Sequence, residues 1–189
     1  MKKKYKAIII GGSAGSYQVI NKILASFSYQ LSIPVFLVLH RLKHVRSGFV
    51  ESLNLKSKIS VKEPFDKETV KPGIAYLAPA NYHMYFDYGN KITLSTEPMV
   101  NHSRPSLDLS FMAAAYIYQD KLLSVILSGA NKDGAKGMEV IQKFGGTTIV
   151  QDPLDCQVPA MTKGTLDLIR PDYILNSDRI IEKLKYLLT

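Results

Sequence analysis

Residues 5–16 read YKAIIIGGSAGS, an apolar run that ends in a glycine-rich turn. A continuous run of branched apolar residues is typical of a strand buried on both faces of a parallel sheet. After the turn, apolar residues recur at helical spacing over residues 16–27. The stretch therefore predicts a strand, a tight turn and a helix, which together form the first unit of an α/β fold.

The same alternation continues along the chain. It predicts further strands at residues 33–40, 58–62, 74–77, 121–127 and 147–151, and further helices at residues 47–55, 106–119, 134–144, 158–168 and 178–188. Residues 82–88 and 91–95 flank Gly89-Asn90, which predicts an antiparallel hairpin. We expect a doubly wound, mostly parallel sheet with helices on both faces and the hairpin near one edge.

Length and composition indicate one domain. The chain has 189 residues, of which 46% are hydrophobic and 21% are charged, and no Pro/Gly-rich linker divides it. We therefore predict a single domain over residues 1–189. The one cysteine, Cys156, excludes a scaffold held by internal disulfides. The apolar run after Lys2-Lys3-Lys4 is too short for a signal peptide, and no stretch reaches the ~20 apolar residues of a membrane helix, so we expect a cytoplasmic protein without membrane insertion.

The net charge of +8 raises the alternative of nucleic-acid binding. However, the lysines are spread along the chain, and the densest clusters, at residues 2–6 and 41–46, match no nucleic-acid-binding motif. The charge predicts a solvated basic surface, with electrostatic attraction to an acidic macromolecular partner as the second interpretation. We expect no nucleic-acid partner.

Three polar residues follow predicted strands. Ser13 comes after the first strand, His40 ends the second, and Asp133 lies in the loop after residues 121–127. Since the carboxyl ends of parallel strands meet at one edge of a sheet, these side chains can converge there. A serine needs an imidazole to take its proton, and the imidazole needs a carboxylate to fix its tautomer. The spacing thus favours a catalytic triad of Ser13, His40 and Asp133.

Other interpretations of these residues remain open at this point. Gly-x-Ser-x-Gly over residues 11–15 matches the nucleophile elbow of α/β hydrolases, but their acid precedes the histidine. A dinucleotide site needs glycine in place of Ser13, and a Walker loop needs a following Gly-Lys-Ser/Thr. Ser13 and Asp133 could each be a helix N-cap, and His40 a core residue. His40 and His44 have the spacing of a zinc helix, but Arg41 replaces the required glutamate, so we predict no metal site.

Several longer segments resemble the catalytic domain of the CheB family of chemotaxis receptor methylesterases. They are GGSAGS (residues 11–16), VLH (38–40), KPGIAYLAPANYHM (71–84), VNHSRPSLDLSF (100–111), ILSGANKDGAKGM (126–138) and TTIVQDPLDCQVPAM (147–161). The resemblance implies hydrolysis of γ-glutamyl methyl esters on the cytoplasmic helices of methylated chemoreceptors, with deamidation of receptor glutamines as a further activity. It implies Ser13 as nucleophile, His40 as base and Asp133 as orienting acid, with the backbone amide of Ala130 in the oxyanion site and no cofactor.

The sequence departs from the family pattern at several positions. Near the nucleophile, Ala14 replaces the family's usual Thr and Ser16 replaces a usual Gly. After the histidine, Arg41-Leu42 replace the usual Met-Pro. Before the aspartate, Ala130 and Asn131 replace a usual Met and Gly. The family's N-terminal receiver domain has no counterpart in residues 1–189. Two alternatives stay open: these residues are part of a longer protein, or regulation comes from elsewhere, for example from a separate regulatory protein. The alternative function is a noncatalytic signalling module of the same fold that binds a protein partner.

Overall fold

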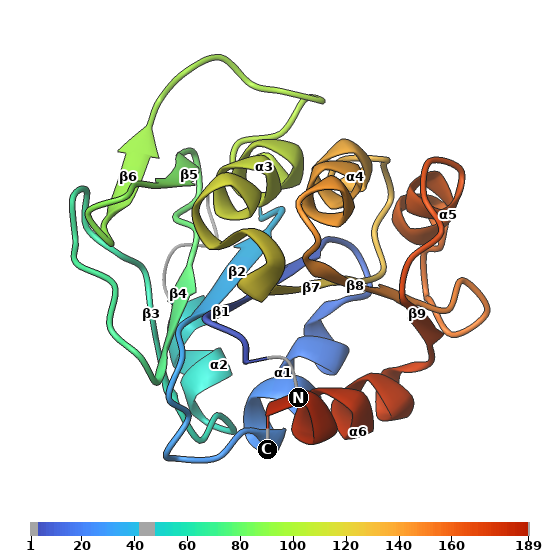
Figure 1. The fold of residues 1–189 in the computed structure, drawn as a ribbon, viewed down its shortest axis with the longest axis horizontal. Coiled ribbons are helices and arrows are strands. Elements are labelled where there is room, and N and C mark those ends of the chain that lie inside the picture. Colours follow the sequence, from blue (N-terminus) through green and yellow to red (C-terminus); the bar gives the residue numbers. More distant parts are fainter. Residues whose placement is uncertain (1–3, 42–47, 189) are drawn as a thin grey trace.

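In the computed structural model, which describes residues 4–41 and 48–188, a parallel sheet runs through the centre of the molecule (Figure 1). Every neighbouring pair of its strands is parallel. Among the described residues the sheet has seven strands, in the order β3 (Ser60–Lys62), β4 (Ile74–Leu77), β2 (Val35–Leu39), β1 (Ala7–Gly12), β7 (Leu122–Ile126), β8 (Thr147–Gln151) and β9 (Tyr173–Leu175).

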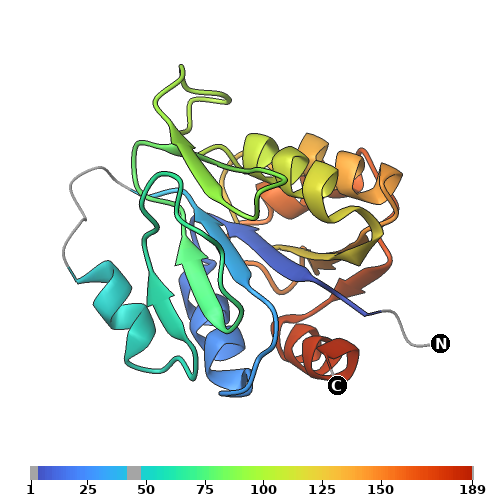
Figure 2. The ribbon, with the colours of Figure 1, turned by 60° about the vertical axis from the view of Figure 1, so that its left-hand side comes forward.

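Helices cover both faces of the sheet (Figures 1 and 2). One layer consists of α1 (Tyr17–Ser26), α2 (Phe49–Asn54) and α6 (Ser177–Leu188), and the other of α3 (Leu107–Tyr118), α4 (Ala135–Lys143) and α5 (Ala160–Leu166). A short 3-10 helix (Gln119–Lys121) links α3 to β7. Within residues 4–41 and 48–188, no helix combines the length and the apolar composition that a bilayer crossing needs.

Alternate residues of the central strands supply two separate hydrophobic cores. Ile8 and Ile10 of β1 belong to the core on the α1 side, whereas Ile9 belongs to the core on the α3 side. Leu37 and Phe36 of β2 divide in the same way. Because side chains alternate between the faces of a strand, a strand between two helix layers must be apolar at every position. This requirement explains the unbroken apolar run that precedes Ser13.

The predicted hairpin forms from β5 (His83–Phe86) and β6 (Ile92–Ser95), which pair antiparallel. It is a small sheet of its own, with β5 packed against α3 (Figure 1). Asn90 in its turn has a φ of 56°, a left-handed conformation that asparagine tolerates. Buried Met84, Phe86 and Ile92 join the core on the α3 side, so the hairpin extends this core at the edge of the molecule.

The fold class predicted from the sequence is confirmed, with two differences in detail. The sequence patterns did not predict β9, a strand of three residues at the sheet edge whose Ile174 is 50% exposed. Its three residues, Tyr-Ile-Leu, are apolar, but a run of three is too short for a strand to be predicted from pattern. The helix predicted at residues 47–55 occupies Phe49–Asn54, and Ser47 lies outside the described residues.

The order of the strands locates the ligand site. From β1 the chain moves to β2 on one side, and it later returns to β7 on the other side of β1. In such sheets the crevice lies outside the carboxyl ends of the strands where the order reverses. The segments that follow β1, β2 and β7 therefore surround the site, and they contain Ser13, His40 and Asp133.

Phe36 is fully buried and packs against several rings, including Phe86 at a centroid distance of 4.2 Å and Tyr118 at 5.8 Å. We predict that Phe36→Ala lowers the free energy of unfolding by about 3–5 kcal/mol, because it leaves a cavity between the sheet, the hairpin and α3. Urea denaturation measures the change. The matched control is Phe65→Ala, at a ring that is 76% exposed, which should cost less than about 1 kcal/mol. Equal losses in the two variants would contradict this account of the core.

Candidate active site

Ser13 lies in the turn between β1 and α1. Its backbone N–H donates to the carbonyl of Ser128 at 2.9 Å, which fixes the turn to the loop after β7. The hydroxyl of Ser16 donates to the carbonyl of Ser13 at 2.7 Å, and Ser16 itself is the N-cap of α1. The interpretation of Ser13 as the helix cap is therefore wrong, and its side chain is available for another role.

Gly15 allows the tight turn that holds Ser13. Its φ of +82° is in the left-handed region that favours glycine, and a Cβ at this position would lie 2.6 Å from Gln157 Cβ and from Ser128 Oγ. The Ser128 hydroxyl donates to the carbonyl of Ala14 at 2.7 Å. The turn is thus packed against the loop after β7 with no room for a side chain at position 15.

His40 directly follows β2, and its backbone N–H donates to the carbonyl of Gly12 at 3.3 Å. The imidazole Nε2 lies 2.8 Å from Oδ2 of Asp133; the side chains are 15% and 0% exposed. An ionised carboxylate only accepts hydrogen bonds, so Nε2 carries the proton and Nδ1 is left unprotonated in the neutral ring. Asp133 thereby fixes the tautomer in which Nδ1 can act as a base.

The carboxylate of Asp133 accepts five hydrogen bonds in a buried position. Oδ2 accepts from His40 Nε2 at 2.8 Å and from the Leu107 N–H at 2.7 Å, and Oδ1 accepts from Asn101 Nδ2 at 3.0 Å, Ser106 Oγ at 2.9 Å and the Asp108 N–H at 3.2 Å. Burial by itself would raise the pKa of Asp133, but these bonds, with His40 first, hold the pKa below its ordinary value. Asp133 therefore caps a helix, as one interpretation predicted, but the helix is α3 rather than α4.

Asp108, in the first turn of α3, makes the reciprocal contact. Its Oδ1 accepts from the backbone N–H groups of Gly134 and Gly137 at the start of α4, both at 2.9 Å. Its Oδ2 accepts from Asn101 Nδ2 at 2.9 Å, so one amide group bridges the two carboxylates. Burial and the nearby charge of Asp133 raise the pKa of Asp108 despite these bonds. The pKa values of the two buried acids are thus shifted in opposite directions, upward for Asp108 and downward for Asp133.

Ser13 and His40 line one cavity of about 240 Å³, together with Ser16, Tyr17, Leu39, Arg41 and Phe49. No hydrogen bond joins the side chains of Ser13 and His40 in the described part of the chain. In unliganded sites such bonds are often long and tighten when substrate binds. The structure therefore brings His40 and Asp133 into direct contact, and Ser13 lines the same cavity as His40.

Ala130 lies in the loop between β7 and α4. The preceding residue, Gly129, is anchored by its N–H to the carbonyl of Val158 at 2.9 Å. Ala130 is exposed, and its backbone N–H donates no hydrogen bond to any described residue. An amide with no protein acceptor on a fixed loop is available to a ligand oxygen. Asn131 accepts from the Asp133 N–H at 3.2 Å, which forms the turn before the acid.

The remaining histidines and the one cysteine were the other candidates for a functional role. His83 is fully buried between the Ser106 N–H and the carbonyl of Pro98, and burial raises the pKa of the Cys156 thiol, which keeps it protonated. Across residues 4–41 and 48–188, no three His, Cys, Asp or Glu residues are grouped to hold a metal ion, and His44 lies outside these ranges.

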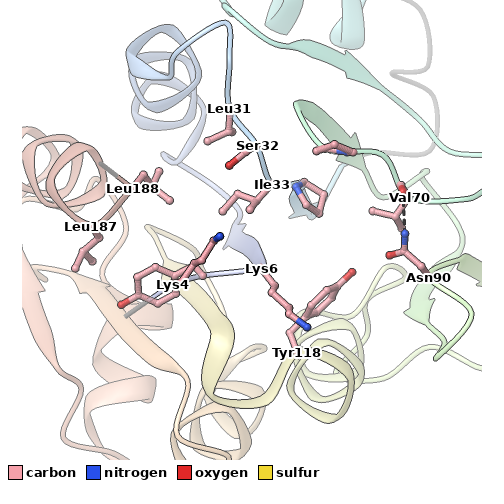
Figure 3. A pocket seen from close by; sticks show the side chains of 13 residues that line it. Lys4, Lys6, Leu31, Ser32, Ile33, Val70, Asn90, Tyr118, Leu187 and Leu188 are labelled. Carbon is pink, nitrogen blue, oxygen red and sulfur yellow. Dashed lines mark hydrogen bonds between the residues drawn. The ribbon is translucent and has the colours of Figure 1, made fainter. Parts of the chain in front are cut away.

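A larger cavity, of about 740 Å³, lies away from this site (Figure 3). Lys6, Ile33 and Pro72, which line it, precede β1, β2 and β4. It therefore opens at the amino ends of the strands, opposite the edge where ligands bind in such sheets. None of the site residues predicted from the sequence lines it.

The sequence reasoning missed the residues that hold Asp133. Asn101, Ser106 and Asp108 all lie in the segment VNHSRPSLDLSF, which carried the family resemblance but received no role. Their polar types at the start of a predicted helix were a signal, because Ser and Asp are favoured there. Nothing in the sequence indicated that the partner would be a carboxylate from a distant loop.

Comparison with known proteins agrees with this geometry. The family model "CheB methylesterase" matches residues 8–184. A candidate protein-glutamate methylesterase/protein-glutamine glutaminase of Leptospira interrogans is 38% identical over 178 residues, which is 94% of this chain and 92% of the relative. A protein-glutamate methylesterase/protein-glutamine glutaminase of Clostridium acetobutylicum is 32% identical over 95% of this chain, which spans 52% of that longer relative.

A solved structure is similar over nearly the whole chain. The crystal structure of the Thermotoga maritima CheB methylesterase catalytic domain superposes with a TM-score of 0.91 at 33% identity. The match covers 97% of this chain and 99% of that domain. The fold of this chain therefore corresponds to that of the catalytic domain.

We predict that Asp133→Asn destabilises the protein most at neutral pH. Because the folded-state pKa of Asp133 lies below the ordinary value of 3.8, ionisation contributes stability above that value, which is lost as the pH falls through the folded-state pKa. Urea unfolding from pH 7 to about pH 3 should show the gap between parent and variant narrowing on acidification. Asp178→Asn, at a side chain that is 78% exposed, should follow the parent curve. A gap that stays constant with pH would contradict the prediction.

Proposed function

The chain belongs to the CheB methylesterase family, and we propose that it hydrolyses γ-glutamyl methyl esters of chemotaxis receptors with Ser13 as nucleophile, His40 as general base and Asp133 as the orienting acid. The names of the family and of its relatives describe carboxyl-ester hydrolases, and the proposed reaction is of that class. We further propose that residues 1–189 act as one catalytic domain, and that the reaction takes place in the cytoplasm, where the substrate helices of receptors lie.

The observation that carries the proposal is the 2.8 Å hydrogen bond between His40 Nε2 and Asp133, together with the cavity that His40 and Ser13 both line. It leaves Nδ1 of the neutral imidazole as the only ring atom that can take a proton. In this arrangement the proton of Ser13 Oγ passes to Nδ1, whereas in the familiar serine proteases it passes to Nε2. The chemistry is the same, since both ring nitrogens belong to one conjugated base.

In the first half of the reaction, Ser13 Oγ attacks the ester carbonyl carbon and its proton moves to His40. The backbone N–H of Ala130 donates to the oxygen that becomes negative. The imidazolium then gives its proton to the methoxy oxygen, and methanol leaves. The product is a γ-glutamyl ester on Ser13, and the charge on His40 is balanced by Asp133 throughout this half.

In the second half, water replaces methanol. His40 takes a proton from water, the hydroxide attacks the acyl-enzyme, and Ser13 leaves with the proton from His40. The receptor side chain becomes a glutamate carboxylate. A glutamine side chain gives the same acyl-enzyme with ammonia as leaving group, in line with the glutaminase in the relatives' names. Every proposed step uses groups of the chain itself and water.

The charge of the chain suits the proposed substrate. Demethylated receptor sites are carboxylates, so a helix bundle that carries many such sites is acidic. The chain has a net charge of +8, which favours encounter with such a surface at low salt. A noncatalytic module of the same fold is not favoured, because the family and its relatives are named as hydrolases.

The first test compares methanol release from a methylated receptor fragment by the parent and by Ser13→Ala. We expect turnover by the parent and a loss of about 10⁴- to 10⁶-fold in the variant, because no other group replaces the nucleophile. Cys156→Ala is the control and should keep parent activity, which excludes the thiol as nucleophile. Methanol release by Ser13→Ala at the parent rate would refute the assignment, and none from the parent with several receptors would favour the binding module.

A second test uses Asp133→Asn. The asparagine can turn its NH₂ toward His40 Nε2, so that Nε2 accepts and the ring carries its proton on Nδ1, which then cannot act as a base. We expect kcat to fall by about 10⁴-fold with little change in KM. Steady-state kinetics on the same receptor fragment measure both constants. Asp167→Asn, at an exposed ion pair with Lys132, is the matched control. A change confined to KM would contradict an orienting role.

A further inference from the structure

Arg41 is buried in the wall of the candidate active site. It follows His40 in the chain, its side chain is 3% exposed, and it lines the cavity that contains Ser13 and His40. Arginine is rarely buried without full pairing, because a desolvated charge and its N–H groups need acceptors. The hydrogen bonds that this side chain makes, and those that it lacks, therefore indicate which chemical group the cavity binds.

Within residues 4–41 and 48–188, only one of the three guanidinium nitrogens of Arg41 has acceptors. Nη2 donates to the carboxylate of Glu63 and to the carbonyl of Ala78, the latter at 3.0 Å. The guanidinium also lies over the ring of Phe49, at 5.0 Å from its centroid. Nε and Nη1 are buried and have no hydrogen-bond partner in the described residues. Three N–H groups of this buried cation therefore have no acceptor among the described residues, and Arg41 lines the same cavity as Ser13.

Unpaired buried donors are costly, and a site that retains them commonly uses them for a ligand. Glu63 does not remove the need, since its side chain is 38% exposed and water screens part of its charge. A planar cation with free N–H groups is best satisfied by a carboxylate, which accepts charge-assisted hydrogen bonds. The unsatisfied groups thus favour an anionic acceptor on the substrate.

We propose that Arg41 is a specificity residue that binds a carboxylate of the receptor next to the esterified glutamate. The inference rests on the proposed function and names the feature of the substrate that the site prefers. On a helical substrate, side chains three or four positions from the ester lie on the same face. An acidic residue at such a position reaches Arg41 while the ester carbonyl lies against Ser13. The enzyme then selects esters within clusters of acidic residues.

The test uses helical peptides with one γ-methyl glutamate and a Glu, Gln or Ala three or four positions away. Methanol release gives kcat/KM for each peptide, and the ratio of the Glu peptide to the Ala peptide measures the preference. We expect a ratio of about 10 in the parent, from charge-assisted hydrogen bonds, and a ratio near 1 in Arg41→Met. Gln should fall between Glu and Ala. Turnover of the Ala peptide that depends on Ser13 tests the proposed function separately.

Glu63→Gln keeps the test decisive if Arg41→Met does not fold. This variant keeps Arg41 but removes its charged partner, so the ratio should rise above that of the parent and fall again at high salt. If Arg41 serves only to hold Glu63 and the carbonyl of Ala78, both variants change the Glu and Ala peptides by the same factor. A parent ratio near 1 at every spacing, or a parent-like ratio in Arg41→Met, would overturn the proposal.

Discussion

The N-termini of α3 and α4 are each capped by a carboxylate from the segment that begins the other helix, and the site depends on this pair of caps. Asp133, from the loop before α4, accepts the first N–H groups of α3, and Asp108, from α3, accepts those of α4. A helix N-terminus leaves N–H groups without acceptors and carries a partial positive charge, so each acid meets both needs of the other helix. Neither helix can shift without breaking the cap of its neighbour, which fixes the loop that carries Asp133.

Burying two carboxylates side by side is unfavourable, and the structure separates their roles. Asn101 donates hydrogen bonds to both acids, but of the two only Asp133 also accepts hydrogen bonds from His40 and from the hydroxyl of Ser106. The directions of the pKa shifts follow, downward for Asp133 and upward for Asp108. Negative charge is therefore held at the acid that faces the imidazole. The helix caps serve stability and, through the same bonds, the electrostatics of the site.

The sequence predicted the central parts of this structure because they depend on local pattern. The apolar runs of β1, β2 and β7 must be buried on both faces, and that requirement can be read residue by residue. The approach of His40 to Asp133 followed from the rule that strand ends share an edge, without any contact being known. Two features could not be predicted: the amide that Asn101 shares between two acids, and the Arg41 nitrogens that lack a partner among the described residues. Both depend on side-chain directions across segments far apart in the chain. Asn101 has a φ of 51°, a conformation that sequence pattern does not specify.

The order of the proposed triad residues along the chain follows from the topology. Strand β1 lies between β2 and β7, so Ser13 emerges from the middle strand, with His40 on one side. His40 directly follows β2, whereas Asp133 lies several residues beyond the end of β7, at Ile126. That loop length lets the acid turn back over the end of β1 and meet the imidazole. An acid placed directly after β7 would remain on the far side of Ser13, and α3 would lose the hydrogen bonds that its first N–H groups donate to Asp133. The distance in sequence between β7 and Asp133 is therefore itself a structural requirement of the site.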